Sequence, residues 1–432
     1  ERSENNLNFN SKIQLKKLSP NRLDVFKVSN CETIEYFFWK KFWKILPKRI
    51  GKGSILINRE SHLLYETTIN LTRMGFAIKK LSMPQLFDKE YSSKIEDFYN
   101  KIIKPIVNEH ISFFLTKEKQ KIAECIFKKK FLKDLNIYEQ SVEIWNSKIE
   151  YFKKIKTKAL FDSFVVGPVW HALSEVLRKN KILICSFQHG HNKEFCDLTK
   201  YSTATFGEMV TSDLFFCYSN MTNNFIKKNV PYSKSKIFPV GIPKYYTHKH
   251  NHLLKGIKKS VFLYLSTCVH SSHTQPIVTS NWSDKEKTQK EIFIVENILS
   301  KIKHSCIYKT YPVKVYPDNE QIEKCINKYN NIFYFDSEYD LMFLKNHAQM
   351  IITSRATSTL GWCMATSMPL IYINYKSNYC VTNEFKSDAR DAIFFFEAEE
   401  KDFQKKIVTF LNQPIKEIKR DWYLRKKKRK KL

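Results

Sequence analysis

Residues 350–374 read MIITSRATSTLGWCMATSMPLIYIN and hold one complete β-α-β unit. The apolar run 350–353 predicts a buried strand, 358–366 predicts a helix, and 369–373 predicts a second buried strand. Because both strands are short and apolar throughout, the unit predicts parallel pairing through a right-handed crossover. Polar residues fill the loop between the first strand and the helix.

The same alternation of short apolar runs and helical patterns extends in both directions from this unit. Further strands are predicted at 54–58, 76–81, 181–187, 213–219, 236–240, 260–266, 306–309, 332–335 and 392–396. Further helices are predicted at 61–73, 225–229, 285–303, 318–328, 339–346 and 401–411. Repeated β-α units of this length favour the α/β class, with doubly wound parallel sheets.

Gly241-Ile242-Pro243 interrupts the alternation and suggests a boundary between two units. We therefore predict two doubly wound, Rossmann-like domains that face a cleft. The predicted segments are a first domain at 1–243 with a helical insertion near 89–158, a second domain at 258–412 and a basic tail at 413–432. Ligands of such sheets bind beyond the carboxyl ends of the strands.

The composition excludes several broad classes of protein. A hydrophobic fraction of 43% with 14% aromatic residues excludes a disordered chain, and no apolar run reaches the roughly 18–20 residues of a membrane-spanning helix. The ten cysteines are scattered without a CxxC pair, which favours free thiols in a reducing compartment. With no charged-then-apolar leader at the start, the sequence predicts a cytoplasmic protein.

The positive charge is large, because 73 Lys and Arg residues stand against 43 Asp and Glu residues, a net charge of +30. It clusters in residues 425–431, a run of consecutive cations, and in 34–49, where lysines alternate with aromatic and aliphatic residues. Both segments suit an anionic membrane surface, so we expect a peripheral position at the inner face of the cytoplasmic membrane. An ordinary helix packed on its own domain is the alternative for 34–49. A basic nucleic-acid-binding protein is the rival function, although no nucleic-acid motif is present.

A polar loop follows the predicted strand 181–187 and collects candidate catalytic groups. It contains Gln188, His189, Gly190, His191 and Glu194. Imidazole and carboxylate groups suit general acid–base chemistry, so this loop is a candidate catalytic loop. A structural polar turn is the alternative, and no third ligand supports a metal site.

The loop after strand 350–353 combines an arginine with several hydroxyl groups. Ser354 and Arg355 are the first two residues of this loop, and Ser358 and Thr359 are the first two residues of the predicted helix. Free N–H groups at a helix N-terminus, together with these side chains, suit a phosphate. Simple N-capping by a Ser or Thr is the alternative.

Three other loops supply the remaining candidates. The candidates are Lys309, Tyr311 and Pro312 after strand 306–309, Ser266 and His273 around the loop after 260–266, and Glu60 after 54–58. The lysine would neutralise a nucleotide phosphate, the Tyr-Pro pair would flank a base, and Glu60 is a candidate base or a helix-capping residue. The sequence has no Walker loop, GxGxxG or GxSxG motif, so it gives no support to P-loop NTPases, Rossmann dehydrogenases or serine hydrolases.

Four segments together resemble one enzyme group. They are FQHGH at 187–191, SDLFFCYSN at 212–220, FPVGIPK at 238–244 and ITSRATSTLGWCMATSMPLIYIN at 352–374. In this order they resemble the GT-B-fold glycosyltransferases of bacterial capsule and lipopolysaccharide synthesis, especially the Kdo transferases. They are more distantly similar to the CDP-glycerol glycerophosphotransferases. The resemblance covers about residues 180–400.

The resemblance implies a glycosyltransferase that moves Kdo or a related acidic sugar from a CMP donor to a lipid-linked or oligosaccharide acceptor. It implies that the loop with Gln188, Gly190 and His191 lies on the acceptor side, with catalytic roles for His189 and Glu194. It also implies phosphate binding by Ser354, Arg355, Ser358 and Thr359. Such enzymes need no bound metal or other cofactor. CMP-sugar transferases often carry His-Pro where this chain has Tyr311-Pro312, so a UDP-sugar or CDP-glycerol donor is the alternative.

Overall fold

A computed structural model describes most of the chain. The described residues are 51–58, 61–86, 92–163, 165–190, 194–196, 207–230, 233–243, 257–267, 282–311, 320–335, 341–376 and 381–425. The predicted helix at 34–49, the cations at 426–431, and the candidates Glu60, His191, His273 and Pro312 lie outside these residues.

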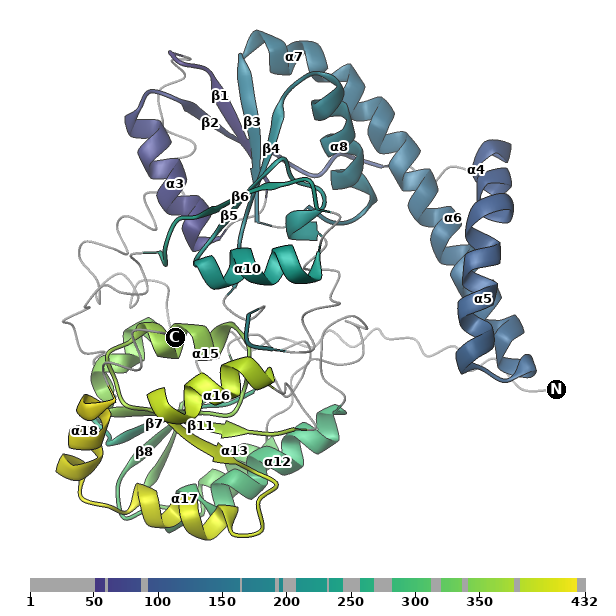
Figure 1. The fold of residues 1–432 in the computed structure, drawn as a ribbon. Coiled ribbons are helices and arrows are strands. Elements are labelled where there is room, and N and C mark those ends of the chain that lie inside the picture. The colour runs from purple at the N-terminus through teal and green to yellow at the C-terminus, as the bar shows by residue number, and fades with distance from the viewer. Residues whose placement is uncertain are drawn as a thin grey trace.

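The first domain is built on a six-stranded parallel sheet in the order β2-β1-β3-β4-β5-β6 (Figure 1). Its strands are β1 (Ser54–Ile57), β2 (Ala77–Lys80), β3 (Thr157–Asp162), β4 (Leu183–Phe187), β5 (Leu214–Cys217) and β6 (Lys236–Pro239). The helices α3 (His62–Arg73), α8 (Pro168–Lys179) and α10 (Asn220–Asn229) accompany it. Leu56 and Leu160 point to one face of the sheet and Ile57 and Phe161 to the other, and all four are buried, as expected for a sheet covered on both faces.

The second domain contains another six-stranded parallel sheet, in the order β12-β11-β10-β7-β8-β9. Its strands are β7 (Phe262–Leu265), β8 (Cys306–Lys309), β9 (Ile332–Phe335), β10 (Met350–Thr353), β11 (Leu370–Asn374) and β12 (Phe394–Glu397). Its helices are α12 (Asp284–Asn297), α13 (Glu320–Ile326), α14 (Leu341–Leu344), α15 (Ser358–Ala365), α16 (Asn383–Ala392), α17 (Phe403–Leu411) and α18 (Ile415–Leu424), with short 3₁₀ turns at Leu299–Lys301 and Lys345–His347. The order of these strands across the sheet, relative to their order in the sequence, is that of the Rossmann fold.

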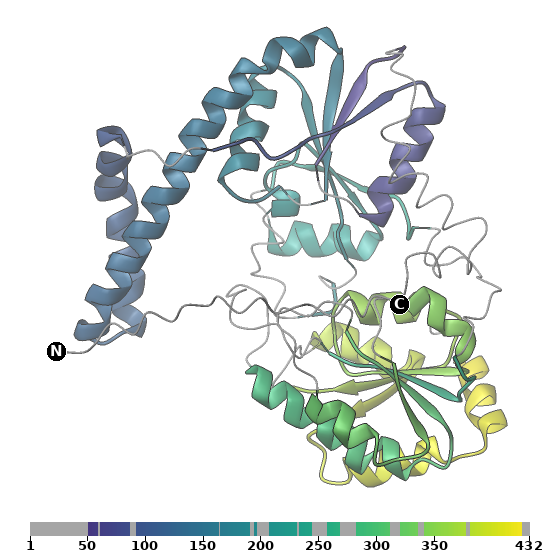
Figure 2. The same cartoon turned by 180° about the vertical axis from the view of Figure 1, so that it is seen from behind.

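A helical hairpin projects from the first domain and stands apart from both sheets (Figures 1 and 2). One side is the continuous run of α4 (Ser93–Phe98), a π-helical segment η1 (Tyr99–Ile103) and α5 (Lys104–Phe114). The other side is α6 (Lys117–Ser147), which α7 (Ile149–Lys154) follows. These helices lie where the sequence predicts the insertion near 89–158.

The α/β class with two doubly wound domains is confirmed, but the structure adds elements that the sequence did not predict. Strand β3 and helix α8 follow the insertion directly, and β3 occupies the middle of the first sheet. Helix α16 was also missed. Strand β3 gives little local signal because it is a short run with polar ends, whereas the apolar residues of α8 recur at helical spacing and do indicate a helix.

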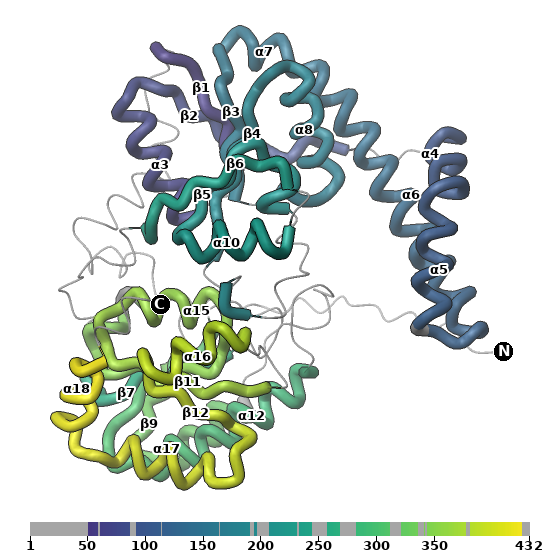
Figure 3. Tube along the Cα trace, in the orientation of Figure 1, coloured from purple at the N-terminus to yellow at the C-terminus, as the bar shows by residue number. Residues whose placement is uncertain are grey.

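The predicted basic tail at 413–432 contains an ordered helix. Ile418 and Trp422 of α18 are buried against the second domain, and α17 and α18 fold back along it at the yellow end of the chain (Figure 3). Arg425, the first cation of the predicted block, donates to the carbonyl oxygens of Arg390 and Ile393, at 2.9 Å each. The boundaries at 243 and 258 stay predictions, because residues 244–256 lie outside the described chain.

The two domains contact each other through loops beyond their strands. Residues 194–196, which follow β4, reach the second domain: Cys196 forms an antiparallel bridge with Val381, and the Phe195 ring lies 5.1 Å from that of Phe385. Phe195 is buried in the core of the second domain. Within the described residues, no helix is both long and apolar enough to cross a bilayer.

Candidate functional site

The second sheet reverses its strand order between β7 and β10, and two candidate loops begin there. The chain runs outward from β7 through β8 to β9 on one side, and from β10 through β11 to β12 on the other. Ser266 follows β7, and Ser354 and Arg355 follow β10. A crevice beyond the carboxyl ends of the strands at such a reversal is where open α/β sheets bind ligands.

The N-terminus of α15 lies beside this reversal and has no side-chain cap within the described chain. Thr357 is the N-cap residue, in an extended conformation, and its hydroxyl makes no capping hydrogen bond. Ser358 and Thr359 are the first two helical residues and are half-buried. Simple N-capping therefore does not explain the hydroxyl groups, and the positive end of the helix dipole remains available to an anion.

A buried ion pair lies directly under the loop after β10. Lys290 and Glu291, adjacent on α12, are both buried, and the Lys290 Nζ lies 3.0 Å from Glu291 Oε1. The Lys290 ammonium also donates to the Ser354 hydroxyl. Because a buried ammonium needs its partners, this bond ties the loop after β10 to α12.

The Glu291 carboxylate connects α12 to two strands, β7 and β8. Its Oε1 accepts from the Thr267 backbone N–H at 3.3 Å and from the Tyr264 hydroxyl at 3.2 Å. Its Oε2 accepts from the Tyr308 hydroxyl at 2.7 Å. Burial, followed by the Glu291 charge, raises the pKa of both tyrosines well above the usual value, so both remain hydroxyl donors.

The electrostatics around Lys290 favour an anion close by. Burial lowers the pKa of the Lys290 ammonium, Glu291 opposes this effect, and the positive charge of Arg355 lowers the pKa further. The two positive charges therefore lie near enough to repel each other. A bound phosphate would reduce that repulsion.

The remaining second-domain candidates lie around the same edge of the sheet. The Arg355 guanidinium sits over the Tyr311 ring, with its central carbon 5.2 Å from the ring centroid. The Lys309 ammonium donates to the Thr310 carbonyl at 2.7 Å, and Ser266 Oγ donates to the Thr267 carbonyl at 3.3 Å. Stacking and local hydrogen bonds thus orient the predicted donor-binding residues.

In the first domain, Gln188 organises the loop after β4 from a fully buried position. Its Nε2 donates to the Gly190 carbonyl at 3.0 Å and to Glu194 Oε1 at 3.3 Å. Its Oε1 accepts from the Tyr218 backbone N–H at 2.9 Å. The Glu194 carboxylate also accepts from the Thr222 hydroxyl. In this arrangement Glu194 holds the loop in shape.

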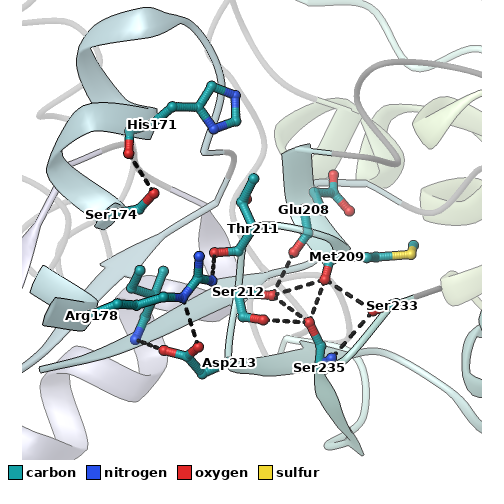
Figure 4. A network of polar contacts seen from close by, with 11 residues as sticks. His171, Ser174, Arg178, Glu208, Met209, Thr211, Ser212, Asp213, Ser233 and Ser235 are labelled. Carbon is teal, nitrogen blue, oxygen red and sulfur yellow. Dashed lines mark hydrogen bonds and ion pairs between the residues drawn. The ribbon is translucent and has the colours of Figure 1, made fainter. Parts of the chain in front are cut away.

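His189 lies between two buried residues but is itself exposed. Its backbone N–H donates to Glu208 Oε1 at 3.4 Å, so the loop is fixed while the imidazole faces outward. The segment that carries Glu208 is held by hydrogen bonds from Ser212 and Ser235 (Figure 4). In that view the Glu208 carboxyl points away from the serine cluster. The anchoring leaves His189 accessible to a substrate.

The close approach of Gly190 to Ser358 brings the two candidate loops together. A Cβ atom on Gly190 would lie 2.2 Å from Ser358 Oγ and 3.1 Å from Ser358 Cβ. Only glycine allows the backbone of the first domain to come this near to the first residue of α15. The loop that carries the candidate His189 therefore lies close to the first residue of α15.

Sequence reasoning missed several polar residues at this site. Lys290 and Glu291 stand in a Lys/Glu-rich helix, where nothing distinguishes them from surface charges. Asp162 is buried at the end of β3 and accepts a hydrogen bond of 2.7 Å from Asn58 Nδ2. This pair marks the point where the first sheet reverses its order, between β1 and β3. A correct prediction of β3 would have identified this pair of residues as site candidates.

Comparisons with known proteins give structural likeness only. No protein-family model matches the chain, and no curated protein matches it in sequence. Among solved structures, it is similar to S. aureus MnaA with UDP (10% identity, 86% of this chain and 90% of that chain, TM-score 0.46). It is also similar to UDP-GlcNAc 2-epimerase from Neisseria meningitidis bound to UDP-GlcNAc (12% identity, 86% of this chain and 93% of that chain, TM-score 0.46). A third similar structure is Acinetobacter baumannii MurG (10% identity, 88% of this chain and 95% of that chain, TM-score 0.41).

Among the described residues, no group of three or more His, Cys, Asp or Glu side chains is arranged to hold a metal ion.

Proposed function

We propose that the protein is a GT-B-type glycosyltransferase that uses a nucleotide-sugar donor. The observation that carries the proposal is the contact between Gly190 and Ser358. It brings the loop that carries the exposed His189 next to the N-terminus of α15, which follows Arg355. Such a pairing joins a proton acceptor to an anion seat, the two functions that glycosyl transfer needs.

In this proposal the second domain binds the donor phosphate. Arg355, Ser354 and the N-terminal N–H groups of α15 would contact the phosphate oxygens, and Tyr311 would keep the guanidinium oriented. When the bond between the anomeric carbon and the phosphate oxygen breaks, the electron pair stays on the phosphate. These groups would stabilise that charge.

The first domain would bind the acceptor. His189 would accept the proton of the acceptor hydroxyl as its oxygen bonds to the anomeric carbon. Glu194, fixed by Gln188 and Thr222, would position the loop without touching the reacting atoms. Glu60 stays a candidate base, and Lys309 a candidate phosphate ligand.

The sequence resemblance extends the proposal to the substrates. We infer a CMP-linked acidic sugar such as Kdo as donor, and a bacterial surface polysaccharide or lipopolysaccharide as acceptor. A UDP-sugar or CDP-glycerol is the alternative donor. A cytoplasmic site of action, at the inner membrane face, belongs to the same proposal.

A thermal-shift panel with CMP, CDP, UDP, GDP and inorganic phosphate tests the proposal. We expect one nucleotide to raise the melting temperature of the parent, and Arg355→Ala and Ser358→Ala to abolish the rise. Arg420→Ala is the matched control, because Arg420 is exposed on α18 and pairs with Asp421. A response to CMP alone supports the CMP donor, and a response to UDP or CDP replaces it. No nucleotide response, or an unchanged one in Arg355→Ala, would refute the anion seat.

A further inference from the structure

The helical hairpin carries exposed apolar side chains at high density. Of the nineteen exposed large hydrophobic residues among those described, seven belong to residues 98–127, and each is between 43% and 75% exposed. They are Phe98, Ile102, Ile106, Phe113, Ile122, Ile126 and Phe127. Single exposed apolar residues are ordinary, but such a cluster on one projecting element indicates an interaction surface.

Buried side chains, and not these exposed ones, form the core of the hairpin. A small core of Ile95, Tyr99 and Leu132 joins its two sides. Farther along α6, Trp145 is buried. Its indole N–H donates to the Val169 carbonyl at 3.1 Å, and its ring centroid lies 6.1 Å from that of Trp170. The hairpin is therefore anchored on α8 at one end, and the half with the exposed residues stands away from the domains (Figure 2).

Lysines alternate with the exposed apolar residues along the same helices. Residues 93–133 contain ten lysines and five acidic residues, a net charge of 10 − 5 = +5. Only two of the acids form ion pairs within the hairpin, Glu124 with Lys104 and Glu96 with Lys128, at 3.0 Å each. Lys130 pairs with Asp134 at 2.7 Å, and the other lysines, including Lys117, Lys119 and Lys121 at the start of α6, face solvent.

We propose that this hairpin docks the protein on an anionic lipid surface. Apolar side chains would enter the boundary between headgroups and acyl chains, and lysines would contact the anionic headgroups at about 1 kcal/mol each. Charge selects lipid over a second copy of the chain, because two 93–133 segments that each carry +5 repel each other. The docking site is independent of the proposed nucleotide site.

Vesicle co-sedimentation of the full-length protein tests the proposal. The probes are vesicles of phosphatidylcholine alone and of phosphatidylcholine mixed with phosphatidylglycerol. The apolar variant is Ile102→Ser/Ile106→Ser/Phe113→Ser, and the charge variant is Lys117→Glu/Lys119→Glu/Lys121→Glu. The control is Tyr423→Ser/Leu424→Ser, which removes exposed apolar groups from α18 in the other domain.

We expect the parent and the control to bind the mixed vesicles, and each hairpin variant to bind at least tenfold more weakly. Melting temperature and nucleotide response should match the parent in all variants, which separates this result from a failure of the proposed function. The proposal is overturned if the parent binds neither vesicle or if the hairpin variants bind like the parent. Light scattering that shows a dimer lost in the apolar variant would also overturn it, in favour of a second copy.

Discussion

The ring of Trp362 meets the ring of Tyr218 at an interplanar angle of 71° and a centroid distance of 5.6 Å, across the two domains. Tyr218 in turn donates its hydroxyl to the Gln188 carbonyl at 3.0 Å. The aromatic contact thus links α15 to the loop that holds His189. Edge-to-face aromatic pairs add about 0.5–1.5 kcal/mol beyond the area they bury.

Trp362→Ala should separate the two halves of the site. We expect a loss of about 2–4 kcal/mol in the free energy of unfolding, measured with urea, because a large half-buried ring is removed. The nucleotide response should weaken at the same time. Trp362→Phe keeps a ring and should retain most of both properties. An unchanged nucleotide affinity in Trp362→Ala would show that the contact does not support the site.

Gly190→Ala should create a clash at the domain contact. The new methyl group would lie 2.2 Å from Ser358 Oγ, so the loop must shift away from α15. We expect a cost of about 1–3 kcal/mol in stability, as for other overpacked positions, together with reduced transfer activity. The double variant Gly190→Ala/Ser358→Gly removes the opposing atoms and should recover stability. A Gly190→Ala protein as stable as the parent would contradict the close approach.

Lys290→Met should weaken phosphate binding through Ser354. The lost charge-assisted hydrogen bond corresponds to about 1.5–3 kcal/mol, or roughly a tenfold or greater loss of nucleotide affinity by calorimetry. Because both residues act through one bond, Lys290→Met/Ser354→Ala should lose less than the sum of the single changes.

Lys287→Met is the matched control for that series. Lys287 is also a buried lysine of α12, but it pairs with Asp284 at 3.0 Å. Its removal should leave the nucleotide affinity unchanged. Equal losses for Lys287→Met and Lys290→Met would mean that α12 acts only through general stability.

Glu397→Gln should reduce stability in a pH-dependent way. Burial alone would raise the pKa of Glu397, but hydrogen bonds from Lys386 and Asn374 outweigh it and hold the pKa below its usual 4.5. A depressed carboxyl pKa stabilises the fold above the unfolded value, and this contribution is lost as pH falls through the folded value. We expect Glu397→Gln to lower the free energy of unfolding by about 1–3 kcal/mol at neutral pH. The loss should become smaller at pH values below the usual pKa of the carboxyl group.

Urea titrations of the parent and Glu397→Gln across the acidic range measure this effect. Glu400→Gln is the control, because Glu400 forms an exposed pair with Lys406 and should change stability little at any pH. A cost of Glu397→Gln that does not vary with pH would show that packing, and not charge, holds this residue.

The sequence alone determined the α/β class, most strands of both sheets and the loops that follow them. Residues 350–374 illustrate why: strand, loop and helix signals are local, and β10, α15 and β11 formed close to where the pattern placed them. Short elements with mixed polarity, such as β3, carry too little local signal, because their burial comes from neighbouring strands.

Only the tertiary structure decided which loops meet. Gly190 and Ser358 lie in different domains, and the Lys290–Ser354 bond joins a helix to a loop far along the chain. The solvent exposure of Phe113 and the nearby apolar residues likewise depends on how the hairpin lies relative to the rest of the molecule. Contacts of this kind depend on the packing of whole domains, and a periodic pattern in sequence specifies only which face of each element is buried.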